Sequence, residues 1–408
     1  MPADVAPLFP WLSALAVILL ALQLPMLAVL LSRLMQGPFR RPPLLPQPST
    51  LEQLGSVSVV VPTLNEAARL SPCLEGLSCQ GYEVREVLVV DSRSTDGTQA
   101  VVKAYQAYDP RLRLLEDDPL PQGWVGRPWA LDYGFRHTSV ASTWVLGIDA
   151  DTQPQPGLVA ALVRAMERED YDLVSLAPRF ILKQPGEFWL QPALLMTLVY
   201  RFGPAGSSSN SAQRVMANGQ CFMVRRSLLE QLDGYRSAAT SFCDDVTLAR
   251  YAAAQGAKVG FWDGSRLLKV RMYEGIAETW REWGRSLDLK DAASTAQVWW
   301  DWAFLALMQG LPWLLVPGLI AIQQAMPAAW SLALQVLLAV NASLLLMRLG
   351  MQAAVASAYD LQGAPGAWAF WLSPLADLAA VARIGLSSLR RPTQWRGREY
   401  PADGSVEG

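Results

Sequence analysis

The stretch VSVVVPTLNE at residues 57–66 decides the fold class of this 408-residue chain. Its valine-rich first half is typical of a strand buried on both faces of a parallel sheet. A helix is expected to follow from Ala67. In such sheets ligands bind beyond the carboxyl ends of the strands. We therefore expect Asn65, near the end of this stretch, to lie at a ligand-binding edge of the sheet.

Three further strands are expected at residues 86–90, 113–115 and 143–148, each with a helical segment between it and the next. Strands that alternate with helices predict an α/β, doubly wound and mostly parallel sheet. Asp91 ends the second of these four strands and Asp149 ends the fourth. We therefore expect both carboxylates to lie at the same sheet edge as Asn65.

The block GIDADT at residues 147–152 places Asp149 and Asp151 two positions apart at a strand end. Residues i and i+2 of an extended segment point the same way. Carboxylate oxygens suit hard divalent cations that also bind phosphate-bearing substrates. The spacing therefore predicts a site for Mg2+ or Mn2+ at these two residues.

These blocks, together with EVLVVDSRSTDGT at residues 86–98, resemble the family 2 glycosyltransferases of GT-A fold over about residues 55–290. The resemblance implies that residues 62–66 and Asp91 line the base and ribose of a nucleotide-sugar. A carboxylate at Asp91 would accept the imide N–H of uracil, which favours a UDP-sugar. Asp149 and Asp151 would hold the ribose and the metal.

Two later blocks extend this resemblance. QGWVGRPWAL at residues 122–131 resembles a segment of a membrane subgroup that includes ceramide, hopanoid-associated and carotenoid glycosyltransferases. Arg127 stands there in place of the usual lysine and would pair with the diphosphate. ANGQCF at residues 217–222 is implied to lie near the donor sugar, where Gly219 lets the backbone approach the ligand and Gln220 binds it.

FCDDV at residues 242–246 resembles the acidic block that holds the family's catalytic base. Asp245 matches the base, which takes the proton of the acceptor as it attacks the sugar. Asp244 is expected to support it or to cap the helix that follows. The Gln-x-x-Arg-Trp block of many membrane members is missing from the sequence, which favours transfer of one sugar over synthesis of a polysaccharide.

Apolar runs lie at both ends of the chain, which is 51% hydrophobic. Residues 11–32 predict a membrane span, and the arginines that follow it place the next domain in the cytoplasm. Residues 302–323 and 331–347 predict two more spans. Residues 367–386 carry Asp377 and Arg383, which are costly within a bilayer. We expect an interfacial or re-entrant segment there, with a third C-terminal span as the alternative.

Residues 188–202 are unusually apolar for a segment inside an α/β domain. They predict either an interfacial helix that guides a lipid acceptor or a buried helix against the membrane segments. The expected organisation is an anchor at 1–36, a Pro-rich linker at 37–54, a GT-A domain at 55–295, membrane or interfacial helices at 296–389 and a basic cytoplasmic tail at 390–408.

Composition excludes several other classes. The net charge of −2 argues against nucleic-acid binding. One histidine excludes a Ser-His-Asp triad, and four cysteines without a CxxC pair argue against a zinc site. The sequence thus predicts an integral protein of the cell (inner) membrane that glycosylates a hydrophobic lipid, such as a carotenoid, hopanoid or sphingoid lipid. The alternatives are a polysaccharide synthase and an inactive membrane scaffold.

Overall fold

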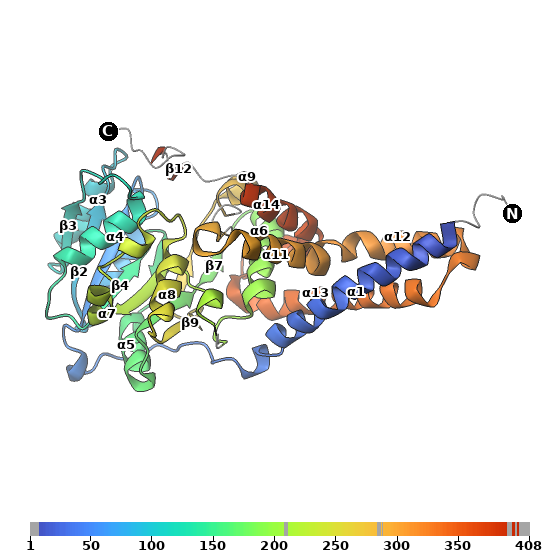
Figure 1. The fold of residues 1–408 in the computed structure, drawn as a ribbon. Helices are drawn as coiled ribbons and strands as arrows, with labels where there is room; N and C mark the ends of the chain where they lie inside the picture. Colours follow the sequence, from blue (N-terminus) through green and yellow to red (C-terminus); the bar gives the residue numbers. More distant parts are fainter. Residues whose placement is uncertain are drawn as a thin grey trace.

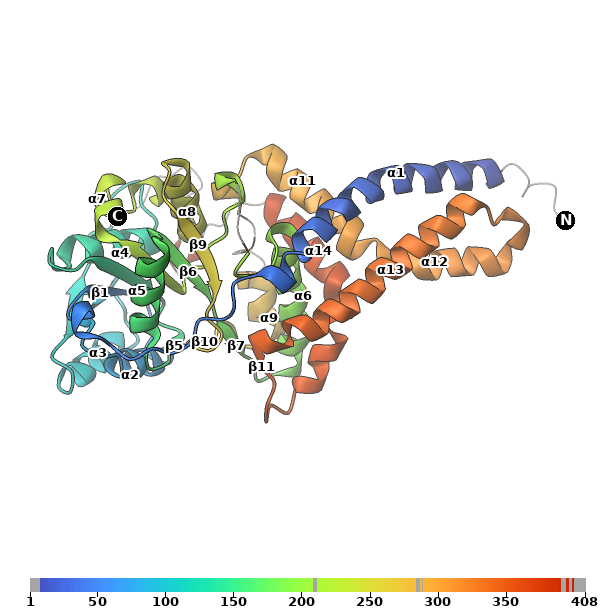
Figure 2. The same ribbon diagram turned by 90° about the horizontal axis from the view of Figure 1, so that it is seen from below.

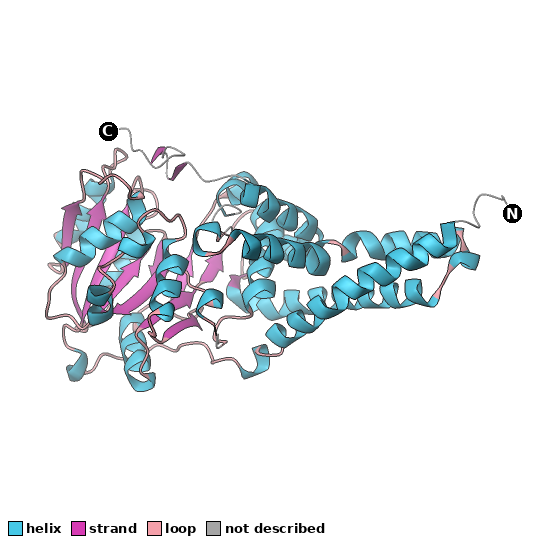
Figure 3. Cartoon of the chain, in the orientation of Figure 1, coloured by secondary structure: helices cyan, strands magenta, loops and turns pink. Residues whose placement is uncertain are grey.

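The computed structural model describes residues 8–207, 211–283, 287, 289–389, 394–395 and 398–399. It consists of an α/β domain and a bundle of helices that extends away from it (Figure 1). Strands gather in the α/β domain, and helices make up the bundle (Figure 3). Most of the expected basic tail at 390–408 falls outside the described residues.

A seven-stranded sheet forms the centre of the α/β domain, in the order β3-β2-β1-β4-β8-β6-β9. All pairs are parallel except those of β8, which runs antiparallel to β4 and β6. This confirms the predicted mostly parallel sheet and all four predicted strands. The strands are β1 (Val57–Thr63), β2 (Val84–Asp91), β3 (Leu112–Glu116), β4 (Trp144–Ile148), β6 (Leu173–Ala177), β8 (Cys221–Arg225) and β9 (Val259–Asp263).

Helices cover both faces of this sheet because successive strand residues point to opposite sides. Val59 and Val61 pack in one core with α2 (Ser71–Ser78), α3 (Thr98–Gln106) and α5 (Leu158–Glu169), whereas Val60 packs on the other face. That second face is covered by α4 (Gly126–His137), α7 (Arg226–Gln231) and α8 (Asp244–Ala254). A Cβ on Gly134 of α4 would lie 2.3 Å from Val60 Cγ1, so glycine permits the close contact of helix and strand.

The prediction that a helix begins at Ala67 is wrong, because α2 begins at Ser71. Asn65 adopts a left-handed backbone with φ of 55°. The N–H of Ala67 donates to Asp96 Oδ2 at 2.9 Å. These two features hold residues 65–67 in a turn and delay the helix.

A second sheet joins the α/β domain to the helical bundle. Its order is β11-β7-β10-β5, and its strands come from distant parts of the chain. They are β5 (Thr152–Pro154), β7 (Arg179–Ile181), β10 (Leu268–Val270) and β11 (Tyr359–Asp360). No sequence pattern predicts this sheet, since strands of two or three residues carry no periodicity.

The bundle contains three helices that are long and apolar enough to cross a membrane, at Pro10–Phe39, Leu332–Ala358 and Ala367–Leu389. The predicted span at 302–323 is broken: Thr295–Gly310 and Pro312–Ala325 meet at 46°. A π-helix at Ala306–Gly310 directly before Pro312 accounts for the bend. The bundle helices are α1 (Leu8–Leu34), α6 (Pro185–Phe202), α11 (Thr295–Leu305), α12 (Pro312–Ala325), α13 (Leu332–Val355) and α14 (Asp377–Leu389).

Helices α1, α12 and α13 run side by side away from the α/β domain, whereas α6 and α14 lie at the base of the bundle (Figures 1 and 2). Gln23 of α1 and Asn341 of α13 are fully buried and exchange two hydrogen bonds of 3.0 Å. In the predicted acceptor helix, α6, eleven residues are buried against its neighbours. This supports the prediction of a buried helix over that of an interfacial helix.

Residues 367–386 form a 3-10 helix, Ala367–Ala376, followed by α14. Asp377 is paired with Arg348 of α13, with Nε 2.8 Å from Oδ2. Pairing lowers the cost of burying either charge, so Asp377 does not by itself exclude a span. Whether this segment crosses the bilayer or lies at its surface stays a prediction.

The Pro-rich linker packs on the α/β domain, and we call residues 37–48 the strap. The guanidinium of Arg41 stacks 3.7 Å above the ring of Trp262. Leu44 is buried and donates its N–H to Asp263 O at 2.9 Å. The strap leaves α1 at the junction of the two parts and follows the α/β domain (Figure 2). It is therefore an anchored segment.

Candidate active site

The carboxyl ends of the central strands bring the predicted site residues together. Thr63 at the end of β1 is paired in register with Asp91 at the end of β2. β4 pairs with the other side of β1 and leads directly into Asp149. The antiparallel β8 begins beside the end of β4, with Cys221 opposite Ile148. This places residues 218–220 at the same edge.

Asp91 is fully buried and holds the loop that follows β2. Its Oδ1 accepts from Thr63 Oγ1 at 3.3 Å. Its Oδ2 accepts from Ser94 N at 3.1 Å and from Gln99 Nε2 at 2.9 Å. The structure thus gives this carboxylate a structural role in the loop, and its contact with a nucleobase stays a prediction.

Residues 65–67 form the neighbouring loop and are tied to the loop after β2. Asn65 N donates to Ser94 Oγ at 2.8 Å, and Asn65 Oδ1 accepts from Thr95 N at 2.9 Å. Glu66 N donates to Thr98 Oγ1 at 2.9 Å. Asn65 is exposed, whereas Pro62, Thr63 and Glu66 are buried. Asn65 therefore presents the most accessible side chain of this predicted group.

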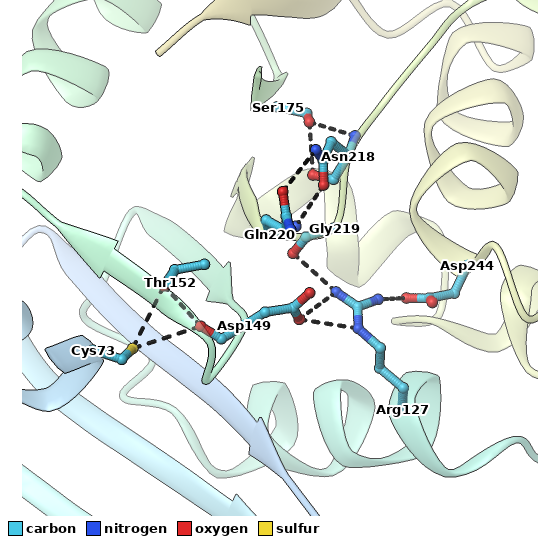
Figure 4. A network of polar contacts seen from close by, with 9 residues as sticks. All are labelled: Cys73, Arg127, Asp149, Thr152, Ser175, Asn218, Gly219, Gln220 and Asp244. Atoms are coloured by element: carbon cyan, nitrogen blue, oxygen red, sulfur yellow. Dashed lines mark hydrogen bonds and ion pairs between the residues drawn. The ribbon is translucent and has the colours of Figure 1, made fainter. Parts of the chain in front are cut away.

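Arg127 at the start of α4 connects three separate segments (Figure 4). Its Nε and Nη2 donate to Asp149 Oδ1 at 3.1 and 2.8 Å. Its Nη2 also donates to Gly219 O at 2.9 Å, and its Nη1 donates to Asp244 Oδ2. The planar guanidinium suits this task because its donors diverge in fixed directions.

Charge balance in this cluster depends on Arg127. Burial alone would lower the pKa of Arg127, but the carboxylates of Asp149, Asp244 and Asp245 outweigh burial and hold that pKa well above its usual value. Burial raises the pKa of Asp244, and the Arg127 guanidinium opposes this shift. One cation thus faces three carboxylates, and the negative charge that remains would attract a further cation.

Gly219 leaves space for the guanidinium. A Cβ at this position would lie 2.2 Å from Arg127 Nη2, so the guanidinium would have to move to make space for it. Asn218 and Gln220 fix the turn around it: Asn218 N donates to Ser175 Oγ at 2.7 Å, and Gln220 N donates to Asn218 Oδ1 at 3.0 Å. Gly219 was expected to admit a ligand, and in this structure it admits Arg127. Ser175 was not predicted, since an isolated serine within a buried strand carries no sequence signal.

Asp245 lies in the first turn of α8, next to Asp244. Burial, followed by the charge of Asp244, raises the pKa of Asp245 to about 7. Arg127 and the backbone N–H groups of Val246 and Gly219 oppose this rise. A carboxylate with a pKa near neutrality is suited to take up a proton during a reaction.

Asp149 and Asp151 are the two residues predicted to bind a divalent cation. Among the described residues, no group of three or more His, Cys, Asp or Glu side chains is arranged to hold a metal ion. Magnesium-type sites commonly use one or two carboxylates together with phosphates of the substrate. The bonds from Arg127 to Asp149 end on Oδ1 and leave Oδ2 for other ligands. Asp149 therefore fits a divalent cation that a diphosphate completes. The extended geometry expected for residues 149–151 is wrong, because they form a turn in which Thr152 N donates to Asp149 O at 3.2 Å, and metal binding by Asp151 stays a prediction.

A cavity of about 490 Å³ lies between this site and the helical bundle. Asn218 and Asp245 line it on the side of the α/β domain. Most of the other lining side chains are apolar and many come from three bundle helices, among them Leu34 of α1, Leu198 of α6, and Met351 and Val355 of α13, while Arg40 and Asp263 add charge at one side. The carboxylate of Asp245 thus opens into an apolar chamber, a feature that no local sequence pattern could reveal.

Part of the chain is similar to known proteins. Residues 58–233 match the model of the family described as Glycosyl transferase family 2. The 4,4'-diaponeurosporenoate glycosyltransferase of Staphylococcus haemolyticus is 26% identical over 248 residues, which are 60% of this chain and 64% of that protein. An N-acetylglucosaminyltransferase of Mesorhizobium japonicum is 30% identical over 206 residues, 49% of this chain and 46% of that protein. The matched stretches thus span less than two thirds of either relative.

A solved structure shares the fold. It is the mannosyltransferase PcManGT from Pyrobaculum calidifontis in complex with GDP-Man and Mn2+, with a TM-score of 0.53 and 22% identity. The alignment covers 93% of this chain and 99% of that chain. At this identity the comparison establishes the fold, which is GT-A.

Proposed function

We propose that this chain, which carries a family 2 glycosyltransferase domain at residues 58–233, is a membrane-bound inverting enzyme that transfers one sugar from a nucleotide-sugar to a hydrophobic lipid. The observation that carries this proposal is the apolar cavity that reaches Asp245 from the bundle helices. A water-soluble acceptor would lose its hydration in such a chamber without replacement hydrogen bonds. A lipid would fill it favourably.

The donor would bind at the carboxyl edge of the sheet. The loops at residues 62–66 and around Asp91 would hold the nucleoside, Gln220 would contact the sugar, and Arg127 would face the diphosphate. Asp149 and Asp151 would hold Mg2+ or Mn2+, which supplies positive charge that stabilises a leaving diphosphate. UDP is proposed from Asp91, whereas PcManGT was solved with GDP-Man.

Asp245 would act as the base. Its carboxylate takes the proton of the acceptor's hydroxyl or carboxyl group while that oxygen attacks C1 of the sugar and the nucleoside diphosphate departs from the opposite side. A single displacement of this kind inverts the configuration at C1. Asp244, held by Arg127, keeps a negative charge beside Asp245 that supports its basicity.

The acceptor class follows from the cavity and from one relative. The name of 4,4'-diaponeurosporenoate glycosyltransferase favours a carotenoid-type acceptor within the wider class of carotenoids, hopanoids and sphingoid lipids. We place the protein in the cell (inner) membrane with the catalytic domain on the cytoplasmic side. The supporting observations are the apolar helices, Arg33 in the last turn of the first of them, and Arg40 and Arg41 after it.

The test is mass spectrometry of lipid and pigment extracts from cells that express the wild type, Asp245→Asn or the control Asp170→Asn. Asp170 has a largely exposed side chain and a left-handed backbone that asparagine tolerates. A lipid one sugar heavier is expected with the wild type and the control, and not with Asp245→Asn. A product with many sugars would instead identify a polysaccharide synthase, and no product despite intact nucleotide binding would refute the proposal.

A further inference from the structure

Two hollows meet at one residue, Arg40. The first is the apolar cavity beside Asp245. The second is a surface groove of about 400 Å³ lined by the end of α1, the start of the strap and the loop at Gly206 and Ser207. Arg40 is the residue common to the linings of both. Its side chain therefore forms part of the wall that separates the cavity from the surface.

The wall is held by a small set of polar contacts. Arg40 Nη1 donates to Asp263 Oδ2 at 2.8 Å and to Ala205 O at 3.2 Å. Arg41 N donates to Gly206 O at 2.9 Å. The Arg40 side chain is 30% exposed, so water competes for its ion pair and keeps the pair weak.

The groove lies at the membrane end of the strap. The candidate span Pro10–Phe39 ends one residue before Arg40. Met35 and Phe39 line the groove and are 66% and 88% exposed, which is unusual for side chains of this size. At the end of a membrane helix such residues contact lipid. The groove is therefore open to the region where a bilayer would meet the protein.

The strap beyond this point is fixed. Arg41 stacks on Trp262, and Leu44 is buried and bonded to Asp263 O. On the facing loop, Gly203 and Gly206 both have left-handed backbones, with φ of 85° and 89°. Movement can thus be confined to residues 37–40 and 203–205, while the rest of the strap remains docked and Gly206 stays as the fixed edge, bonded to Arg41 N and to Phe261 O.

We propose that residues 37–40 and 203–206 form a lateral portal, closed by Arg40, through which the lipid acceptor passes from the bilayer into the cavity. This proposal rests on the proposed function, since it concerns the entry of that acceptor. Arg40 leaves Asp263 when the portal opens, and Asp263 keeps its second hydrogen bond, from Ser265 N at 3.0 Å. The acceptor then slides past Met35 and Phe39 with its polar end leading toward Asp245.

A reversible lock tests the portal. A Cβ on Gly37 would lie 3.8 Å from Pro204 Cγ, so Gly37→Cys with Pro204→Cys is placed to form a disulfide across it. The exposed Cys79 is replaced by serine to prevent mispairing. In liposomes, the oxidised protein is expected to transfer sugar to a membrane-dissolved acceptor at least tenfold more slowly, and dithiothreitol is expected to restore the rate. Each single cysteine variant is the matched control. Full activity of the oxidised protein would overturn the proposal.

A second readout does not require activity. Cys243, a native thiol on the cavity wall, is replaced by serine for this readout, and Ala354→Cys then places a single thiol there, where an N-alkylmaleimide dissolved in the bilayer reports entry. Labelling is expected to slow in the locked protein and to become several-fold faster in the pair Arg40→Ala with Asp263→Asn. Unchanged labelling in both would refute the portal even if the protein proved inactive. Labelling that slows in the locked protein and becomes faster in the double variant, without any sugar transfer, would support the portal and refute the proposed function.

Discussion

Arg127 Nη2 lies 2.8 Å from Asp149 Oδ1, which joins the first turn of α4 to the end of β4 across the candidate active site. The carboxylate predicted to bind a metal is therefore held by a guanidinium in this structure. Binding of a diphosphate with its cation would give Arg127 a new anionic partner and release Asp149 for the metal. Arg127 is the residue on which both the charge balance and the geometry of the site depend.

Replacing Arg127 by alanine is expected to abolish transfer and to lower stability. The change leaves the buried Asp244 without its cation, which costs about 3 kcal/mol in comparable buried pairs. Arg127→Lys keeps the charge but cannot reach Asp149, Asp244 and Gly219 together, so a smaller loss of stability and a large loss of activity are expected. Thermal unfolding and calorimetric titration with nucleoside diphosphate measure the two effects. Wild-type stability of Arg127→Ala would contradict the role assigned to the cluster.

Gly219→Ala is expected to have a similar functional effect without removing any charge. The added methyl group would overlap the Arg127 guanidinium and displace it from Gly219 O and Asp149. Gly350→Ala on α13 is the matched control, because no atom lies within 4 Å of a Cβ there. A strong loss of donor affinity is expected only for the first variant. Equal affinities would show that the position of Arg127 does not govern donor binding.

The rate of transfer is expected to depend on pH through Asp245. The base must be ionised, and the pKa of Asp245 is raised to about 7. The rate should fall about tenfold for each pH unit below 7 and level off above it. Asp245→Asn should remove this profile and lower the rate by roughly 10²–10⁴-fold. A pH-independent rate between pH 5 and 8 would place the base elsewhere.

The same pKa has a consequence for stability, with a defined sign. A folded-state pKa above the ordinary value of 3.8 means that the folded protein holds the proton more tightly than the unfolded chain. Stability should therefore decline as pH rises from about 4 to 7 and stay constant above 7. Asp245→Asn removes this cost, so its melting temperature should exceed that of the wild type at pH 8 but not at pH 4.

Substitution of Asp151 should weaken cation binding more than it changes the fold. Asp151→Asn keeps the size of the side chain and removes its charge. In the presence of a nucleoside diphosphate, Mn2+ is expected to bind at least tenfold more weakly to this variant, as measured by electron paramagnetic resonance. The thermal stability of the metal-free protein should change little. Unaltered Mn2+ affinity would remove Asp151 from the metal site.

The ion pair between Arg348 and Asp377 should be strongly coupled. Both side chains are almost fully buried, at 2% and 0% exposure, and Gln309 and Trp313 also donate to Asp377. Asp377→Ala leaves a buried arginine and is expected to cost about 3–5 kcal/mol. The double variant Arg348→Met with Asp377→Leu should recover part of this loss. Unfolding in detergent micelles measures both, and a double variant no more stable than Asp377→Ala would contradict the pairing.

The sequence predicted the elements that local patterns define. The valine-rich strands at residues 57–61 and 86–90 and the acidic end of β4 lie where expected, because buried parallel strands carry a strong apolar signal. The contacts of Arg127 were not predictable in this way, since Asp244 and Gly219 are distant in the chain. Their meeting depends on β8 entering the sheet in reverse, beside β4.

Within the bundle, the sequence contained a partial signal for the ion pair between Arg348 and Asp377. A lone arginine at 348 and a lone aspartate at 377 each interrupt an apolar run. Two such charges predict a buried pair only when the helices that carry them are known to touch. The cavity beside Asp245 was even harder to predict from the sequence, because its walls combine α1, α6, α13 and the sheet edge.

The docked strap has a consequence for what the protein recognises. With Arg41 on Trp262, Leu44 buried and β11 of the bundle paired with β7, the α/β domain cannot swivel freely on the helical bundle. The reactive carboxylate is then carried at a constant height relative to the leaflet. Two lipids of equal girth and flexibility would be distinguished by how deep their reactive oxygen sits in the bilayer. The protein would thus select its acceptor by the depth of the reactive oxygen as well as by the shape of the lipid.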